Sequence, residues 1–548
     1  MFKKLLALIL AATCVVAMTA CGPEFDRGDG EDSSSYDETK TYLNVGNYNG
    51  GLGEAWLREV ADRYQAQNPD VIIKINNDKD GYAEQYLTEK MEEYGNDIYF
   101  INGFTYNNLV NKGLAADITD VVTSNIPGET RSIEDKMDDT LNSYYKTSDN
   151  KYYAVPFHVN VFGSVYDVDL FDEKGFYFDK SGKIIGEGAS KDNLSAGPNG
   201  VEGDYDDGLP ATYAQWQELL AEIASYSMVP YIWTGEYTYY RYRWLAAQWA
   251  DYEGKANFDL NLSFNGEYTF PGDSTATKID LTNAYLLQKQ PGKKYALDMA
   301  EHIVRNGYYV KTSFDSVNTH TMAQQEYLLS VEKSQLAGDN QRVAMIFEGA
   351  WWENEARDFF NTMAVSYDNE NYAYGNRKFG FMPTPKTEGS ASGTTLISST
   401  SNSVVFVASC SEKQELAKDF LQFAHSDESL RTFSRVTGSI RPYDYDLTEN
   451  DKAQMTHFAK NMWEIYRSPN TQISHVTIYM DKIFESGISY INQTNWWWGS
   501  TIGGTTMVDA FYEMSQNTAL TATQYFNGLA VTYSKAQWDS KMSSYYKK

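Results

Sequence analysis

The stretch "TYLNVGNYNGGLGEAWLREVADRYQAQNPDVIIKINN", residues 41–77, decides the fold class. Its first seven residues alternate as a strand does, and "NGG" forms a turn. Trp56, Val60 and Tyr64 then recur at helical spacing. "NPD" ends the helix, and "VIIKI" is a second, buried strand. A strand, a helix and a strand in this order predict a parallel sheet and an α/β fold.

The same alternation continues along the chain and locates a candidate binding edge. "GYAEQYLTEKMEEYG" predicts a helix, "NDIYFING" a strand and "FTYNNLVNKG" a further helix. In open parallel sheets, ligands bind beyond the carboxyl ends of the strands. The first two strand-to-helix turns therefore predict six binding residues, namely Asn47, Tyr48, Asn49, Phe104, Tyr106 and Asn107.

The N-terminal residues predict export and attachment to a membrane. Two lysines precede the apolar run "LLALILAATCVVAM", which has the length of a signal peptide, and we expect residues 1–20 to be removed. Small residues before Cys21 and Gly22 after it resemble a bacterial lipobox, which implies a lipidated Cys21. Residues 21–40 are rich in Asp, Ser and Gly and predict a flexible tether. The folded part is thus expected outside the cytoplasm, anchored to the outer face of a Gram-positive-like cell membrane.

The overall composition excludes several function classes. A chain of 548 residues is long enough for two or more domains. The net charge of −28 argues against nucleic acid and against an anionic membrane surface as partners. After processing only Cys410 remains, so no disulfide can form within the chain. Forty-three tyrosines and twelve tryptophans suit a protein that grips a ligand through flat, amphipathic rings.

Six motifs, in one order, carry a family resemblance. They are "NNLVNKGLAADITDVV", "KYYAVPFHVNVFGSVYDVDLFDEKGF", "LPATYAQWQELLAEI", "VAMIFEGAWW", "CSEKQELAKDFLQFAHSDESLRTFSRVTGSIRPY" and "FNGLAVTYSKAQWDSKM". Together they resemble extracellular solute-binding proteins of family 1, the maltose-binding-protein-like subunits that bind carbohydrate for ABC importers. The resemblance extends over roughly residues 42–548, behind the lipobox.

The resemblance implies a periplasmic-binding-protein-like fold, with two α/β lobes, a hinge and a central ligand cleft. We expect lobe 1 to hold residues 41–157 plus 343–391, and lobe 2 to hold residues 158–342 plus 392–548. Two lobes facing each other across a hinge can close on a ligand and shift an open–closed equilibrium.

A sugar ring has an apolar face and a rim of hydroxyls, so its site needs an aromatic ring and polar side chains. The resemblance aligns Trp351 with a motif tryptophan that stacks on sugar, although this ring could instead fix its helix to the core. Tyr231 and Trp233 stand at a strand end before a glycine turn, as binding residues or as core residues. His158 lies at the first hinge crossing, and Arg441 of "GSIRP" could reach the hinge or hold a loop.

The run "INQTNWWWGSTIGGTT" contains three consecutive tryptophans, Trp496, Trp497 and Trp498. On a helix their side chains fan over about 200°, so burying all three is difficult. We expect Trp497 or Trp498 to face the cleft opposite Trp351. The alternatives are that all three are structural or that one contacts the transporter.

The polar insertion at residues 191–208 contains Asp192, Asp204, Asp206 and Asp207 between glycines. Calcium takes oxygen ligands from such loops, so a structural calcium is possible, beside the alternative of a solvated acidic loop. The insertion lacks the EF-hand pattern. We predict no other metal or cofactor.

The sequence therefore predicts a monomeric lipoprotein that captures an oligosaccharide and delivers it to the permease subunits of an ABC importer. A surface-anchored glycoside hydrolase is the first alternative, with Glu348 and Glu353 flanking Trp351 as its carboxylates. The chain lacks G-x-S-x-G, P-loop and H-E-x-x-H motifs. The second alternative is a binder of another solute, such as a peptide, on the same fold.

Overall fold

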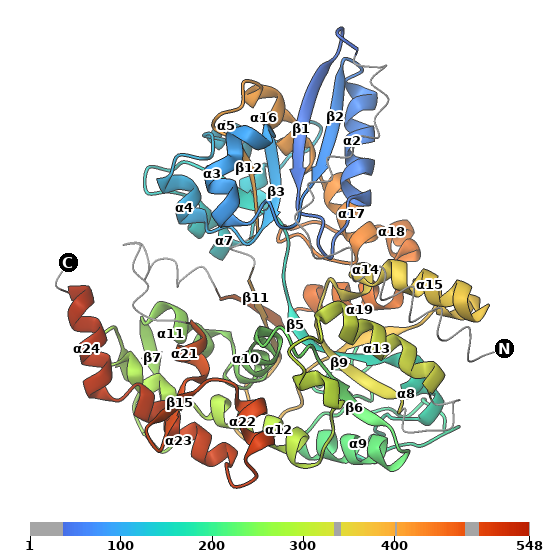
Figure 1. Ribbon diagram of the computed structural model, residues 1–548, viewed down its shortest axis with the longest axis vertical. Coiled ribbons are helices and arrows are strands. Elements are labelled where there is room, and N and C mark those ends of the chain that lie inside the picture. Colours follow the sequence, from blue (N-terminus) through green and yellow to red (C-terminus); the bar gives the residue numbers. More distant parts are fainter. Residues whose placement is uncertain (1–36, 334–340, 400–402, 477–492, 547–548) are drawn as a thin grey trace.

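The computed structural model describes residues 37–333, 341–399, 403–476 and 493–546, which form two lobes (Figure 1). Lobe 1 lies at the top of the view and contains the N-terminal strands, whereas the larger lobe 2 below contains the C-terminal helices. The predicted signal peptide, Cys21 and the tether up to residue 36 lie outside the described residues. None of the helices in the described ranges has both the length and the apolar character needed to span a bilayer.

A five-stranded sheet forms the centre of lobe 1, in the order β2-β1-β3-β12-β4. β1 pairs in parallel with β2 and β3, as the strand–helix–strand pattern predicts, and β12 is antiparallel to β3 and β4. The strands are β1 (Thr41–Asn47), β2 (Val71–Asn77), β3 (Ile98–Asn102), β4 (Val155–Pro156) and β12 (Ser403–Val407).

The helices of lobe 1 cover this sheet, with Trp56 of α2 buried against Phe100, Phe157 and Phe433. α2 ends at Gln67, before the Asn68-Pro69 pair, because a residue before proline disfavours the helical conformation. The helices are α2 (Ala55–Gln67), α3 (Glu84–Tyr94), α4 (Tyr106–Asn111), α5 (Thr119–Thr123), α6 (Ile133–Lys136), α7 (Asp139–Tyr145), α16 (Gln414–Phe423), α17 (Asp427–Thr437) and α18 (Glu449–Gln454).

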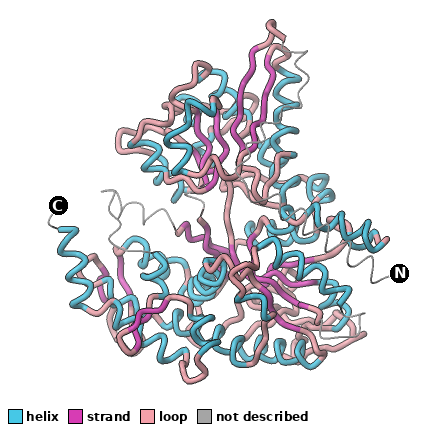
Figure 2. The backbone as a smooth tube through the Cα atoms, in the orientation of Figure 1, coloured by secondary structure: helices cyan, strands magenta, loops and turns pink. Residues whose placement is uncertain are grey.

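Lobe 2 is built around a four-stranded sheet in the order β10-β5-β9-β6. Three two-stranded sheets accompany it, and Figure 2 shows the helices packed around these strands. The strands are β5 (Phe162–Asp167), β6 (Val229–Ile232), β9 (Val343–Gly349) and β10 (Phe379–Met382), with the pairs β11 (Thr394–Ser398) and β13 (Thr471–His475), β7 (Gly266–Tyr268) and β8 (Thr277–Ile279), and β14 (Ser500–Ile502) and β15 (Thr505–Met507).

The helices of lobe 2 include α9, whose predicted N-cap Thr212 is confirmed. The Thr212 hydroxyl accepts from the backbone N–H of Gln215, whose side chain accepts from Thr212 in return. The helices are α8 (Val168–Lys174), α9 (Tyr213–Ser225), α10 (Tyr239–Glu253), α11 (Lys255–Ser263), η1 (Ala284–Lys289), α12 (Pro291–Arg305), η2 (Lys311–Phe314), α13 (His320–Lys333), α14 (Trp352–Glu355), α15 (Arg357–Tyr367), η3 (Glu370–Tyr372), α19 (His457–Arg467), α21 (Gln493–Trp498), α22 (Ala510–Gln516), α23 (Ala522–Thr532) and α24 (Lys535–Tyr546).

The strand pairing corrects the predicted lobe boundaries. The chain leaves lobe 1 between β4 and β5, at residues 157–161. β9 pairs with β5 and β6, so residues 343–391 belong to lobe 2 and not to lobe 1. β12 pairs with β3 and β4, so the chain returns to lobe 1 after β11 and not near residue 343. Both strands are buried along their whole length, and a largely apolar run alone does not specify which sheet it joins.

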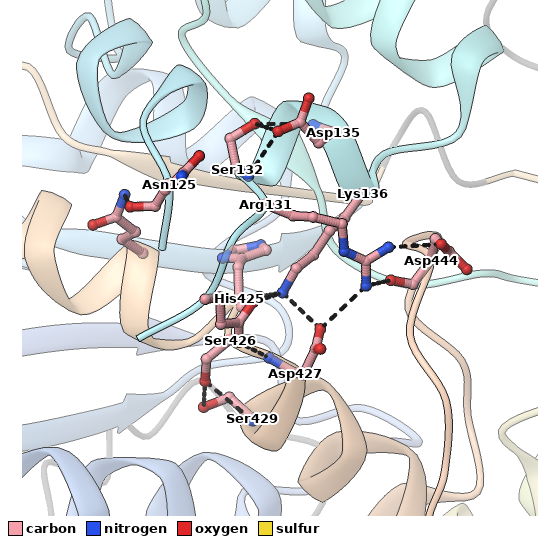
Figure 3. Close-up of polar contacts among 12 residues, drawn as sticks. Asn125, Arg131, Ser132, Asp135, Lys136, His425, Ser426, Asp427, Ser429 and Asp444 are labelled. Carbon is pink, nitrogen blue, oxygen red and sulfur yellow. Dashed lines mark hydrogen bonds and ion pairs between the residues drawn. The ribbon is translucent and has the colours of Figure 1, made fainter. Parts of the chain in front are cut away.

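A buried lysine ties the loops of lobe 1 to the start of α17 (Figure 3). The Lys136 side chain has no exposed surface, and its Nζ lies 2.7 Å from Asp427 Oδ1 and also contacts Glu129. Arg131 donates to Asp444 at 2.6 Å and lies 3.7 Å from Asp427. This network connects α6 with α17 and with the chain that follows α17.

Candidate functional site

A cavity of about 360 Å³ lies between the two lobes, beside residues 157–161. Lobe 1 contributes the turns that follow β1 and β3, and lobe 2 contributes the starts of β5, α10 and α13 and the region of α14. Its lining residues are Tyr48, Gly50, Leu52, Lys79, Asn102, Gly103, His158, Asn160, Phe162, Tyr237, Tyr239, Tyr240, Arg243, His320, Trp351, Glu355 and Ser399.

A second hollow, of about 590 Å³, is larger but lies between the acidic insertion and α19. Its walls carry Asp204, Lys460, Glu464 and Arg467 beside Trp463. We take the interlobe cavity as the candidate site, because it lies where the carboxyl ends of β1 and β3 meet the other lobe.

Trp351 is the central aromatic residue of this cavity. It follows the end of β9 and precedes α14, and its ring meets Phe162 edge to face at a centroid distance of 4.8 Å. Gly51 of lobe 1 has a φ of +70°, and a Cβ there would lie 2.9 Å from the indole. A Cβ at Gly349 of lobe 2 would overlap the same ring. Two glycines from opposite lobes thus make room for one indole, whose contact with a ligand stays a prediction.

The neighbouring Trp352 faces the other way. Its side chain is fully buried and packs edge to face on Phe379 at 4.9 Å. Adjacent residues on a helical turn project about 100° apart. One indole therefore lines the cavity while the next stabilises the core of lobe 2.

A group of aromatic rings from lobe 2 surrounds Trp351. Tyr240 is buried and lies edge to face with Phe162 at 5.7 Å, and Tyr239 packs on Tyr240 at 4.8 Å. Tyr239 is 45% exposed, so much of its ring is available to a ligand. On the lobe 1 side, Tyr48 lines the cavity, as its place in the first turn predicts. These rings give the cavity flat apolar faces with hydroxyl groups at their rims.

The floor of the cavity is polar and formed by the first hinge crossing. Asn160 Nδ2 donates to Asn102 Oδ1 at 3.4 Å, which joins the crossing to the end of β3. His158 lines the cavity although it is only 3% exposed, and neither ring nitrogen has a hydrogen-bond partner among the described residues. Burial, with the nearby charge of Arg441, lowers the pKa of His158 to about 3. The imidazole is therefore neutral at physiological pH.

Among the described residues, one carboxylate lines the cavity, and it already has hydrogen-bond partners within the protein. Glu355 lies 3.3 Å from His320 and accepts from Gln324 at 2.9 Å. Burial opposes ionisation, but these hydrogen bonds outweigh it and lower the pKa of Glu355. Gln324 also donates to Glu348, whose pKa is raised well above its ordinary value by burial and by the charge of Glu355.

Arg243 of α10 extends from the second lobe to the same cavity. Its guanidinium lies over the Trp497 ring, 5.3 Å from the centroid, and donates weakly to Gln493 at 3.4 Å. Its Nη1 is buried without a hydrogen-bond partner in the described part of the chain. Burial lowers the pKa of Arg243 to about 10, so the group stays charged.

Several predicted binding residues lie instead in the core. Trp233 is fully buried and stacks on Phe347 at 5.0 Å, and Tyr231 accepts from Trp216 at 3.1 Å in the same core. These predictions were wrong because β6 ends inside lobe 2, beneath α10. Arg441 is also buried, and it donates to His425 at 2.6 Å behind the hinge.

Most of the residues predicted in the two turns of lobe 1 also lie outside the cavity lining. Asn47 is buried and donates to Gly53 and Asn77, so it fixes the first turn. Phe104 and Tyr106 are core residues, and Tyr106 donates to the backbone of Tyr145. Asn49 and Asn107 do not line the cavity. In the second turn both aromatic residues pack inward, at the start of the short helix α4.

The prediction that Trp497 or Trp498 faces the cavity was wrong, because all three tryptophans of the run are buried. Trp496 packs on Trp538 and Tyr533, and Trp498 donates to the backbone of Tyr242 at 3.2 Å. α21 is covered on several sides by helices of lobe 2, so side chains that fan over about 200° can all be buried. Trp497 lies one layer behind the cavity, under Arg243.

The sequence-based selection missed most lobe 2 residues of the cavity. Tyr237, Tyr239, Tyr240 and Arg243 come from "EYTYYRYR", at the start of α10. The signal was the density of tyrosine and arginine after a strand end. Asn160 and Phe162 gave no local signal, since they are marked only by their place after the first crossing.

The acidic insertion is folded against α19 and other parts of lobe 2. The Asp206 side chain is buried, with Oδ2 accepting from Asn199 N–H at 3.0 Å and Oδ1 without a partner among the described residues. Burial and the neighbouring Asp204 raise the pKa of Asp206 to about 8. No group of three or more His, Cys, Asp or Glu side chains in the described ranges is placed to hold a metal ion.

Comparisons with known proteins agree with this architecture. The profile of a family described as bacterial extracellular solute-binding protein matches residues 59–460, whereas no curated protein sequence matches the chain. Apo RafE from Streptococcus pneumoniae is 13% identical, with a TM-score of 0.52, and the alignment covers 92% of this chain and 99% of that one. A chitin oligosaccharide binding protein has the same four values. A probable secreted solute-binding lipoprotein from Streptomyces coelicolor is 12% identical over 93% and 100% of the two chains, with a TM-score of 0.51. The predicted periplasmic-binding-protein-like fold is confirmed.

Proposed function

The chain belongs to the family of bacterial extracellular solute-binding proteins, and we propose that it captures an oligosaccharide in the interlobe cavity and delivers it to an ABC importer. Membership of this family makes the chain a binding protein and not an enzyme. The observation that carries the proposed ligand class is the pairing of flat rings with polar groups in one interlobe cavity. Trp351, Phe162 and Tyr240 supply the rings, and Asn102 and Asn160 supply hydrogen bonds for hydroxyl groups.

The ligands named for two similar structures support the same class. One matched structure is RafE in complex with raffinose, and another is the chitin oligosaccharide binding protein. The aromatic residues extend over Tyr48, Trp351 and Tyr239, which suits several sugar units better than one.

Two lobes that meet at a ligand give the physical basis of capture. Asn354 Nδ2 donates to Gly51 O across the lobe boundary at 2.9 Å, next to Trp351. A ligand that contacts both lobes binds the closed form more tightly and shifts the equilibrium toward it. The closed form is then the one that permease subunits would recognise. We keep the lipid anchor on Cys21, the extracytoplasmic location and the monomeric state as parts of the proposal.

The arrangement does not favour glycoside hydrolysis. A hydrolase needs two carboxyl groups on either side of the scissile bond. Glu348 and Glu353 do not line the cavity. Both side chains are buried, and they accept hydrogen bonds from Gln324 and Thr456, respectively.

The experiment is a binding screen of purified protein by tryptophan fluorescence and calorimetry. We expect at least one oligosaccharide to bind without release of shorter products. Product formation would contradict the binding-protein assignment. Binding of peptides with no response to any sugar would overturn the carbohydrate class.

A further inference from the structure

Among the charged residues that line the interlobe cavity, Arg243 has no carboxylate partner within the described residues. The cavity carries two cations, Lys79 and Arg243, and one carboxylate, Glu355. Glu355 is held by His320 and Gln324, so it does not neutralise Arg243. The cavity wall is thus cationic in a chain whose net charge is −28.

Three other arginines of the same lobe differ from Arg243 in their partners. Arg241, two residues earlier in α10, donates to Asp509 at 2.6 Å and to the backbone of Thr234 at 3.0 Å. Arg342 and Arg377 of the same lobe both donate to the buried Asp167. Each of the buried arginines Arg241, Arg342 and Arg377 is therefore paired with a carboxylate, whereas the partly buried Arg243 at the cavity is not.

Arg243 is also held in place before any ligand arrives. Its guanidinium lies over the buried Trp497 ring, and Gln493 accepts from Nη2. A guanidinium presents its donors in a planar fork that matches a carboxylate or a sulfate. Nη1 is buried with no hydrogen-bond partner among the described residues. Leaving a buried charged donor unpaired is costly, so the ligand itself is the natural acceptor.

From these observations we infer that the ligand is an acidic oligosaccharide, in which an oxyanion on a sugar ring pairs with Arg243. This inference rests on the proposed function and specifies its substrate class. The oxyanion can be the carboxylate of a uronic acid or a sulfate ester, since both accept two hydrogen bonds from a guanidinium. The aromatic rings around Trp351 bind the apolar faces of the sugars, and Arg243 selects for the charge.

The test compares acidic glycans with matched neutral forms by calorimetry. One arm uses trigalacturonate and its methyl ester, and the other uses a sulfated galactose oligosaccharide and its desulfated form. The expected result is that one acidic probe binds about 10- to 100-fold more tightly than its neutral partner. Arg243→Gln should remove this difference, because it weakens binding of the acidic form far more than binding of the neutral form. Arg243→Lys keeps a cation over Trp497 and should retain part of the preference.

The outcomes separate this inference from the proposed function. If a neutral oligosaccharide binds best, or if Arg243→Gln weakens the acidic and neutral forms equally, the inference is overturned and the function stands. If no glycan of either kind binds, the proposed function itself fails. Because Arg243 packs on Trp497, the melting temperature of each variant is measured first. If Arg243→Gln does not fold, the ratio of acidic to neutral affinity in the wild type and in Arg243→Lys decides the question.

Discussion

Replacing Trp351 with alanine should weaken ligand binding while leaving the fold intact. The indole lines the cavity and makes its main aromatic contact with Phe162, at 4.8 Å. Stacking of a flat ring on an aromatic side chain contributes about 1–3 kcal/mol, by analogy with bases on aromatic platforms. Loss of that contact corresponds to an increase of the dissociation constant by about 5- to 150-fold.

The cost to stability should be small, because Trp351 is only partly buried and its nearest edge-to-face contact, with Phe162, is worth about 0.5–1.5 kcal/mol. Trp352→Ala is the matched control, since it removes the adjacent indole from the core. Its side chain is fully buried, so the free energy of unfolding should fall by about 3–5 kcal/mol. One variant should therefore lose affinity and the other stability.

The assay combines calorimetric titration with urea unfolding of both variants. Trp351→Phe keeps a flat ring and should give an intermediate dissociation constant. If folded Trp351→Ala binds the oligosaccharide as tightly as the wild type, the stacking role of this indole is refuted.

Four further predictions concern stability. The pKa of His158 is about 3 in the folded protein, below its unfolded value, so its contribution to stability is present above pH 6.5 and is lost as the pH falls toward 3; His158→Gln should flatten the acid limb of the unfolding free energy, and an unchanged limb would contradict this. The pKa of Asp206 is raised to about 8, so stability should fall as the pH rises from about 4 to 8, and Asp206→Asn should raise the melting temperature at pH 8. Calcium titration tests the alternative of a structural calcium in the acidic insertion: an ion held by Asp206 would raise the melting temperature of the wild type but not of Asp206→Asn, and no effect on the wild type excludes that site. Lys136→Met removes the buried cation that neutralises Glu129 and the partly exposed Asp427 and should cost about 1–3 kcal/mol in urea unfolding, whereas no measurable loss would show that Arg131 compensates.

The sequence predicts the fold class well because its signals are local. The strand, turn, helix and strand of residues 41–77 form β1, α2 and β2 in the expected parallel arrangement. Trp351 follows a strand and a glycine in the sequence, and it lies in the cavity lining as predicted. Both features depend on residues that are neighbours in the chain.

The errors have a common physical cause. β9 is apolar except for Glu348, and its pattern fits either sheet, so only its pairing with β5 and β6 places it in lobe 2. Trp497 is buried because α10 and α11 cover it, and Arg243 reaches the cavity because it lies on top of that ring. The pairing of β9, the burial of Trp497 and the place of Arg243 depend on contacts between segments that are far apart in the chain. Hydrophobic periodicity carries no information about such contacts.

The position of β12 has a consequence for the time at which the protein can fold. β12 lies between β3 and β4 in the sheet of lobe 1, yet Ser403 pairs with Asn102, roughly 300 residues earlier in the chain. A chain emerging from the ribosome therefore holds two separated parts of that sheet until most of lobe 2 has been synthesised. Contacts between such distant segments form slowly. If residues 1–20 are the signal peptide that the sequence predicts, this delay would keep the first lobe open long enough to be threaded through a translocation channel.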